Sequence, residues 1–475
     1  MTSWSMREAI IPIIFSHCKA FVKGPLNAAQ CPDLVAMRDT HEELKCTNDR
    51  WLCGIMSATF LRDTLRAMPL LRSVSLQIRA REVHGIGWDS LAAVLSTPQL
   101  RSFTVGTFLF SPREAPPETW AGDTLAPITT FRYEQRVFRS VLRAYPVQQD
   151  TLAFVLTRLH RSLESLLLPI EVAPMAVLAH TQWPQLRELS LNGEFRPSTG
   201  DTAPWISLFS GMSKLRVLNL TLALPKGVDR KQLVFWPRGY ESRLPWPDLE
   251  ALTISFPDPE DQIFAHLPPS LRRLSLRCTP HHCLQLWEWR EHSYRHSPIL
   301  HASEMLEILR RLSTPLLDSL QVEYRADDAD DDLMCCITER FPHVRVLELH
   351  RFQASRDDPV PMTSIAKRLA ALRSLHALRA HLELPPSVTA RPPPEYRTAR
   401  VRRYISKDTD ALCEIAATLG SVLPQPGLAV WLLQQEVCGA RWRRFRQIVK
   451  GSIDECPQAE LDPRGDRELA VRVFG

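Results

Sequence analysis

The apolar and polar residues of this chain recur in a six-residue phrase: an aliphatic residue, usually a charged residue, any residue, an apolar residue, usually a polar residue, and an apolar residue. Clear copies are LRSVSL at 71–76, LRELSL at 186–191 and LRRLSL at 271–276. Full copies begin at residues 71, 100, 128, 163, 186, 215, 249, 271, 317 and 344, and a fading copy, LRSLHA, begins at residue 372. Successive full copies start 22 to 46 residues apart. This spacing is typical of a repeat protein.

The second half of each copy predicts a β-strand. Its fourth and sixth residues are apolar and its fifth is usually polar, which is the alternation of a strand buried on one face. Seven copies have Pro two residues before their first residue, where a strand can begin without that amide donor. The spacing leaves room for a return segment, often helical, between parallel strands. The predicted fold class is therefore α/β, an irregular leucine-rich-repeat solenoid (horseshoe) with parallel strands.

Three segments between the copies have the pattern of helices. WDSLAAVLSTP at 88–98 places its aliphatic residues on one face. HASEMLEILRRLSTP at 301–315 has Ser303 as its expected N-cap, and the segment at 327–342 opens with five aspartates, which favour a helix start. Each segment leads directly into a copy of the phrase, so the predicted unit is helix, proline turn and strand.

The phrase also divides the chain into segments. We expect a small helical unit at 1–58, the solenoid at 59–384, a proline-rich and basic linker at 385–403, and a C-terminal cap and tail at 404–475. Within the last segment, residues 408–423 predict an amphipathic helix and residues 427–437 a buried strand. Such a segment would cover the exposed end of the last repeat.

Composition narrows the class of protein. A net charge of +5 over 475 residues indicates no dedicated nucleic-acid surface, although two stretches, 397–403 and 441–450, are basic. Eleven cysteines without paired spacing indicate reduced thiols, hence a cytoplasmic or nuclear protein. No apolar run has the length of a membrane span, and no signal-peptide pattern is present, so we expect no membrane association.

Candidate residues for chemistry are few. Cys278, His281, His282 and Cys283 are four soft ligands close together, but no second pair follows nearby, so we predict no metal site. The aspartates at 327–332 lack the central Gly and the closing Glu of a calcium loop. No nucleophile motif, P-loop, dinucleotide fingerprint or HExxH pattern occurs. We therefore expect neither an enzyme nor a cofactor.

The fifth position of the phrase is the predicted binding surface. In a strand, this residue points away from its buried neighbours, here into the concave face of the repeats. We expect a protein partner on a column that includes Ser75, Thr104, Ser190, Asn219, Thr253, Ser275, Gln321 and Glu348. The leucines behind this column are expected to be fully buried: Leu189, Leu191, Leu218, Leu220, Leu274 and Leu276.

Several stretches resemble leucine-rich-repeat F-box proteins of mushroom-forming (basidiomycete) fungi. The resemblance covers roughly residues 60–385 and is carried by WDSLAAVLSTPQLRSF at 88–103, WPQLRELSLNGE at 183–194, and residues 256–278 and 299–311. It implies a substrate-recognition adaptor of a Skp-cullin-F-box ubiquitin ligase. In such an adaptor the F-box holds the Skp adaptor, which joins it to the cullin, and the repeats hold the protein substrate.

The N-terminal segment is similar to a degenerate or truncated F-box. EAIIPIIFSHC at 8–18 is similar to the opening of that motif, and PDLVAMRDT at 32–40 to a later part, although the leading Leu-Pro is absent. The resemblance makes five residues the expected Skp-adaptor contacts: Ile10, Ile11, Ile13, Ile14 and Phe15. Alternatively, these residues cover the open end of the first repeat, and the chain is a free-standing leucine-rich-repeat scaffold without a ligase role.

Overall fold

The computed structural model describes residues 58–66, 68–77, 88–106, 125–134, 146–195, 203–225, 227–277, 298–355, 359–383, 399–423, 425, 427–436, 439–448 and 458–461. The chain divides into two compact units. Unit 1 comprises residues 1–193 and 208–215, and unit 2 comprises residues 194–207 and 216–475. This boundary falls inside the segment 59–384, for which the repeat pattern predicted one continuous array.

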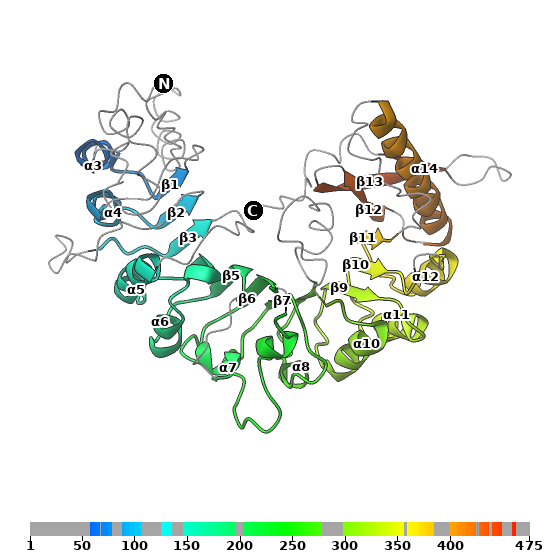
Figure 1. Ribbon diagram of the computed structural model, residues 1–475, viewed down its shortest axis with the longest axis horizontal. Coiled ribbons are helices and arrows are strands. Elements are labelled where there is room, and N and C mark those ends of the chain that lie inside the picture. The colour runs from blue at the N-terminus through cyan, green and yellow to red at the C-terminus, as the bar shows by residue number, and fades with distance from the viewer. Residues whose placement is uncertain are drawn as a thin grey trace, which may run out of the picture. The chain divides into compact units, whose positions relative to one another are not determined.

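Unit 1 alternates parallel strands with helices. Its strands are β1 (Ser73–Gln77), β2 (Ser102–Gly106), β3 (Thr130–Glu134), β4 (Ser165–Pro169) and β5 (Glu188–Glu194), paired in this order. Its helices are α3 (Ala58–Arg66), α4 (Trp88–Leu95), α5 (Pro146–Leu159), the 3₁₀ turn η2 (Ile170–Val172) and α6 (Met175–His180). Figure 1 shows α3 to α6 on one side of the strands.

Unit 2 continues the alternation. Its parallel strands are β6 (Val217–Ala223), β7 (Ala251–Ile254), β8 (Arg273–Leu276), β9 (Ser319–Arg325), β10 (Val346–Phe352), β11 (Ala377–Leu382) and β12 (Ala429–Glu436). Two antiparallel strands follow, β13 (Gly439–Ile448) and β14 (Gln458–Leu461). The helices are α7 (Trp205–Leu208), η3 (Arg230–Leu233), α8 (Ile263–His266), α10 (Ala302–Arg311), α11 (Asp330–Arg340), α12 (Met362–Leu369) and α14 (Ala399–Val422).

The strands of unit 2 have two distinct faces. Helices α8 and α10 to α12 lie on one side of strands β7 to β11 in Figure 1, which we call the helix face. The opposite side is the strand face. No described helix lies on it at strands β7 to β11. The predicted α/β fold of alternating helices and mostly parallel strands is confirmed for the described residues.

A turn precedes the strand of each proline-marked copy. The amide of the first residue of a copy donates to the carbonyl three residues earlier, as in Leu100 to Thr97 at 3.0 Å and Val344 to Phe341 at 3.1 Å. The proline two residues before the copy therefore occupies the second position of a β-turn, where its fixed φ is favourable. The predicted order of helix, proline turn and strand is confirmed at α4, α10 and α11, which precede β2, β9 and β10.

The core is built from the fourth and sixth residues of the phrase. The six leucines named above are at most 2% exposed, as predicted. The register of unit 2 places Leu218 beside Leu252, Leu274 and Leu320 on successive strands. Buried leucines thus form a continuous row behind these strands, so that neighbouring repeats share one core.

The structure corrects the predicted register of the last repeat. The fading copy was placed at 372–377, but β11 pairs Leu347 with Leu378 and Leu349 with Ala380. The copy is therefore LHALRA at 375–380. The error arose because Leu372 and Leu375 are both buried, at 0% and 2% exposure, so the apolar pattern fits both registers. The correction moves Arg379 to the fifth position of the phrase.

The start of α10 also differs from the prediction. Its N-cap is His301, not Ser303, and Glu304 closes a capping box by accepting the His301 amide at 2.8 Å. Ser303 is bonded elsewhere, since its hydroxyl donates to Asp327 at 2.6 Å. A hydroxyl already bonded to a carboxylate on the next repeat does not cap its own helix.

The C-terminal segment follows the prediction in part. The strand expected at 427–437 is β12, and the helix expected at 408–423 belongs to α14. This helix begins at Ala399, so the last residues of the predicted linker are helical. The basic stretch at 441–450 lies mostly in β13. Among the described helices, none has both the length and the apolar character that a membrane span requires.

Candidate functional site

The strand register aligns the predicted fifth-position residues. In unit 1 the aligned column is Ser75, Thr104, Arg132, Leu167 and Ser190. In unit 2 it is Asn219, Thr253, Ser275, Gln321 and Glu348, followed by Arg379 and Trp431. The predicted residues of unit 1 therefore lie in one column, and those of unit 2 lie in another.

Most of these side chains reach solvent. Ser75, Thr104, Ser190, Asn219, Thr253 and Gln321 are half-buried. The expectation of an open column fails at two positions, because Ser275 is 9% exposed and Glu348 is 2% exposed. Both take part in a polar network on the strand face rather than packing under a described helix.

Glu348 is the centre of this network. Its Oε1 lies 2.5 Å from Arg277 Nη1 and 2.9 Å from His350 Nε2. Its Oε2 accepts longer hydrogen bonds, both of 3.4 Å, from Gln321 Nε2 and Arg379 Nη1. The Ser275 hydroxyl in turn donates to Gln321 Oε1 at 2.8 Å. One carboxylate thus joins side chains from β9, β10 and β11 and the residue after β8.

The surroundings keep Glu348 ionised. Burial acts to raise its pKa, but the positive charge of Arg277, the hydrogen bond from His350 and the charge of Arg379 together lower it from 4.5 to about 2. The exposed fractions of the two arginine side chains are 18% and 27%. Solvent therefore reaches the cations of the network but hardly reaches its carboxylate.

The sequence pattern contained a signal for this network. The alternation continues one step past the phrase, to a seventh position occupied by Arg277, Glu323, His350 and His381 on β8 to β11. Side chains at the fifth and seventh positions share one face of a strand. The six-residue phrase ends before this seventh position, so the predicted binding surface did not include it. The predicted surface also lacked Arg379, because the last copy was predicted at 372–377.

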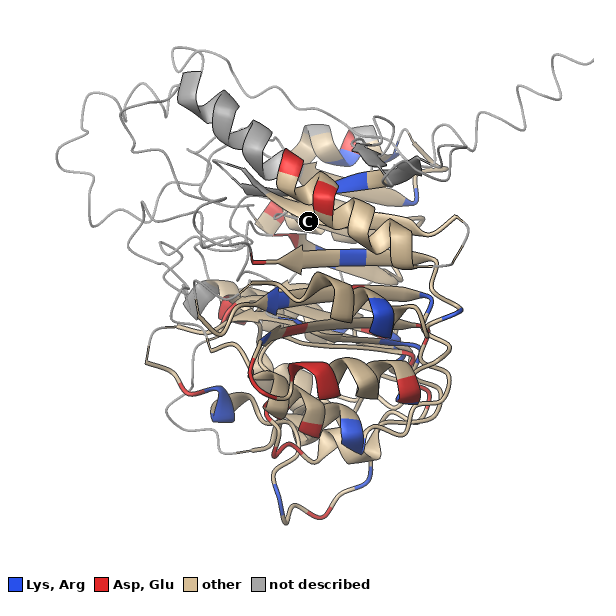
Figure 2. Cartoon of the chain, turned by 90° about the vertical axis from the view of Figure 1, so that its right-hand side faces the viewer, with Lys and Arg blue, Asp and Glu red and all other residues tan. Residues whose placement is uncertain are grey.

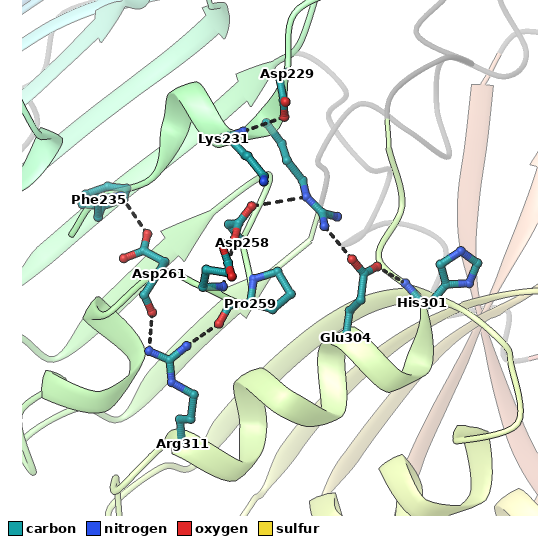
Figure 3. Close-up of polar contacts among 11 residues, drawn as sticks. Asp229, Lys231, Phe235, Asp258, Pro259, Asp261, His301, Glu304 and Arg311 are labelled. Atoms are coloured by element: carbon teal, nitrogen blue, oxygen red, sulfur yellow. Dashed lines mark hydrogen bonds and ion pairs between the residues drawn. The ribbon is translucent and has the colours of Figure 1, made fainter. Parts of the chain in front are cut away.

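A second group of charges, buried or half-buried, joins the loops that follow β6 and β7 to helix α10. It comprises Arg230, Asp258, Asp261, Glu304 and Arg311, which we call the loop cluster (Figure 3). Arg230 lies 3.5 Å from Asp258 and 2.5 Å from Glu304. Arg311 donates to the backbone carbonyl of Asp261 at 2.7 Å and to that of Pro259. The cluster joins η3, the loop after β7 and helix α10.

Asp261 anchors the loops through backbone amides. Its Oδ2 accepts the Phe235 amide at 2.7 Å, and its Oδ1 accepts the amides of Trp236 and Ile263, both at 3.0 Å. Burial raises the pKa of this carboxyl from 3.8 to about 6, against the lowering effect of the three amides and with a smaller upward contribution from Asp258. Asp261 therefore titrates near neutral pH.

A shallow hollow of about 640 Å³ adjoins the loop cluster. It is lined by Trp236, Tyr240, His266, Glu307 and Arg311, among others. Trp236 stacks on His266 with ring centroids 4.4 Å apart. Arg311 at the edge of the hollow is already bonded to two backbone carbonyls.

Comparison with protein families and curated proteins does not place this chain in a family. No protein-family model matches it, and no curated protein matches it either. The resemblance to fungal F-box repeat proteins therefore stays a prediction, and the function is argued from the site.

Two predicted sets lie outside the described residues. They are the five expected Skp-adaptor contacts at 10–15 and the cysteine and histidine run at 278–283. Within the described part of the chain, no group of three or more His, Cys, Asp or Glu side chains has the geometry to hold a metal ion.

Proposed function

We propose that this chain is a non-enzymatic leucine-rich-repeat protein that binds a protein partner on its strand face. One observation carries the proposal: the fifth-position residues form an aligned, mostly half-buried polar column within each unit. A column of this kind presents successive repeats to one partner. Residues on rigid strands are also held in place before binding, which reduces the entropy lost on association.

The middle of the column favours close approach. Asn219 and Thr253 are short side chains, and they hold each other through a hydrogen bond of 3.0 Å from Thr253 Oγ1 to Asn219 Oδ1. Behind them, Leu218 and Leu252 are fully buried. A partner would therefore meet a firm polar surface whose shape changes little on binding.

The test uses two matched Thr→Trp variants of the full chain. Thr253→Trp adds a large side chain to the strand face, whereas Thr363→Trp adds the same side chain at an exposed position on α12. Proteins captured from the source organism by the wild type are quantified for each variant. We expect Thr253→Trp to lose at least one partner by about tenfold, which is about 1.4 kcal/mol, and Thr363→Trp to retain it.

The proposal fails if Thr253→Trp captures the same proteins as the wild type in the same amounts. Binding would then use another surface. A thermal melt of both variants checks that each is folded before capture is compared.

We further propose that the partner is a substrate of a Skp-cullin-F-box ubiquitin ligase. This finer role is supported only by the resemblance of residues 8–40 and of the repeats to fungal F-box proteins. It predicts that purified Skp adaptor binds the full chain, and that Ile10→Asp with Ile11→Asp abolishes the binding. The conservative pair Ile10→Val and Ile11→Val should retain it.

If the full chain binds no Skp adaptor, the ligase role falls. The free-standing scaffold then remains as the function, because that function requires the strand face alone.

A further inference from the structure

The charges on the strand face of β8 to β11 differ in how far they reach solvent. Across the third, fifth and seventh positions of these four repeats, the acidic residues are Glu323 and Glu348, at 3% and 2% exposure. The basic residues are Arg273, Arg277 and Arg379, of which the first is exposed and the other two are half-buried. Solvent therefore meets arginine on this part of the surface.

The arginines also hold more hydrogen-bond donors than the network uses. Each guanidinium has five N–H donors. Arg277 and Arg379 each donate from Nη1 to one oxygen of Glu348, and their side chains are 18% and 27% exposed. Their Nε atoms are buried, so a partner would use the Nη donors. Arg273 has no ion pair with any described residue. Two cations share one carboxylate, and Arg273 adds a third at the start of β8.

We propose that this surface recognises an acidic peptide segment of the partner, whose Asp or Glu carboxylates bind Arg273, Arg277 and Arg379. The inference rests on the proposed function and names the chemistry of the partner. Carboxylate matches the fork of guanidinium donors, as it does in the contacts with Glu348, and such charge-assisted pairs are about twice as strong as neutral hydrogen bonds.

The aromatic residues nearby favour a peptide over a nucleic acid. Trp431 and Trp442 are only 7% and 3% exposed, and Trp442 packs edge-on against His350 with centroids 5.7 Å apart. Single-stranded nucleic acids are bound by stacking bases on exposed aromatic rings. Neither tryptophan offers such a ring.

The described helices of unit 2 carry charges of both signs. On the side of the molecule shown in Figure 2, Lys and Arg are interspersed with Asp and Glu along the described elements. Helix α10 carries both signs, for example Glu304 and Arg310, and α12 pairs Arg368 with Asp331 of α11. Mixed charges of this kind cancel over short distances.

The inference is tested by fluorescence anisotropy with the full chain and three labelled probes: a peptide of twelve glutamates, a peptide of twelve glutamines, and a twelve-nucleotide oligothymidine. We expect the glutamate peptide to bind at low salt and to weaken as salt rises, and the glutamine peptide not to bind. Arg277→Gln combined with Arg379→Gln should weaken binding of the glutamate peptide at least about tenfold.

A second variant guards against loss of folding. The double variant leaves Glu348 buried without its cations, whereas Arg273→Glu changes an exposed residue outside the network. We expect Arg273→Glu to weaken glutamate-peptide binding by about fivefold, because charge reversal replaces attraction with repulsion. The matched control, Arg310→Glu at an exposed position of α10, should leave binding within about twofold of the wild type.

Three results would overturn the inference: no glutamate-peptide binding by the wild type, equal binding by Arg273→Glu, or oligothymidine binding as tight as that of the peptide. If one of these occurs while Thr253→Trp still loses its captured partner, the strand face binds a partner of other chemistry and the proposed function stands. If Thr253→Trp captures normally, the proposed function itself has failed.

Discussion

Glu348 on the strand face and Asp261 in the loop cluster are equally buried carboxylates, each 2% exposed, yet their pKa values move in opposite directions. Glu348 faces two guanidinium groups and a histidine, and its pKa falls to about 2. Asp261 is held by backbone amides, and its pKa rises to about 6. Burial disfavours the ionised form of both carboxyls. At Asp261 the three amide dipoles do not offset the effect of burial on the pKa, whereas at Glu348 the full positive charges do.

The two carboxylates therefore serve different purposes. Glu348 stays ionised throughout the physiological pH range, and its buried carboxylate holds Arg277 and Arg379 in place. Asp261 has its pKa near 6, and its carboxyl fixes the loops after β6 and β7 through backbone amides.

The largest loss of stability is expected when the Glu348 carboxylate itself is removed. Glu348→Ala leaves Arg277 and Arg379 without their shared partner, so we expect the free energy of unfolding to fall by about 4 kcal/mol. Urea denaturation at pH 7 measures this. The matched control is Glu250→Ala, because Glu250 is 39% exposed and its contact with Arg216 is 3.5 Å long. A loss no larger than that of the control would show that the network does not stabilise the fold.

A smaller effect appears in acid. The pKa of Glu348 is about 2 in the folded chain and about 4.5 unfolded, so its contribution is complete above pH 4.5 and is lost as pH falls toward 2. The shift corresponds to about 3 kcal/mol. Glu348→Gln should remove this part of the pH dependence, which denaturation at several pH values between 2 and 5 measures. An unchanged acid slope would contradict the assignment.

The contribution of Asp261 to stability should change with pH in the opposite direction and over a different pH range. Its pKa is about 6 when folded and about 3.8 unfolded, so the contribution of Asp261 to stability is complete below pH 3.8 and is lost as pH rises toward 6, by slightly less than the Glu348 contribution. Asp261→Asn should flatten the profile between pH 4 and 6. If the wild type shows no decrease over this range after correction for its other groups, Asp261 is already ionised and the contrast with Glu348 disappears.

The smallest effect is expected where a similar ion pair is exposed. Arg368 and Asp331 are 2.5 Å apart, with side chains 45% and 51% exposed. Water solvates both groups in the folded and unfolded chain, so Arg368→Gln should leave the denaturation midpoint unchanged within error. A clear decrease would mean that burial is not what separates the networks from ordinary surface pairs.

Much of the fold could be predicted because each strand is encoded locally. The alternation within the phrase and the proline before it are enough to place β2, β9 and β10. The register of β11 was missed because Leu372 and Leu375 are both buried and both fit the first position. Local pattern alone does not choose between two such leucines.

The two sites differ in how far the sequence could reveal them. The strand-face column follows from alternation, and its seventh position could have been included by the same rule. The partners of Asp261 are the backbone amides of Phe235, Trp236 and Ile263, two of them about 25 residues away in sequence. Backbone amides are present in nearly every residue, so no side-chain pattern marks these partners.

The spacing of the strands determines which residues of a crossing peptide can reach the arginines. Neighbouring strands lie about 4.8 Å apart, so β8 and β11, three strands apart in the sheet, are separated by about 14 Å. An extended peptide advances about 3.4 Å per residue, and side chains four residues apart on one side of it span about the same distance. Arg379 lies two residues further along β11 than Ala377, the residue level with Arg273, which adds about 7 Å along the strands and separates the two Cα atoms by about 16 Å. A partner lying obliquely across the strands would thus meet these two long side chains with carboxylates at positions i and i+4. A peptide whose two glutamates are only two residues apart could not place one glutamate at each arginine.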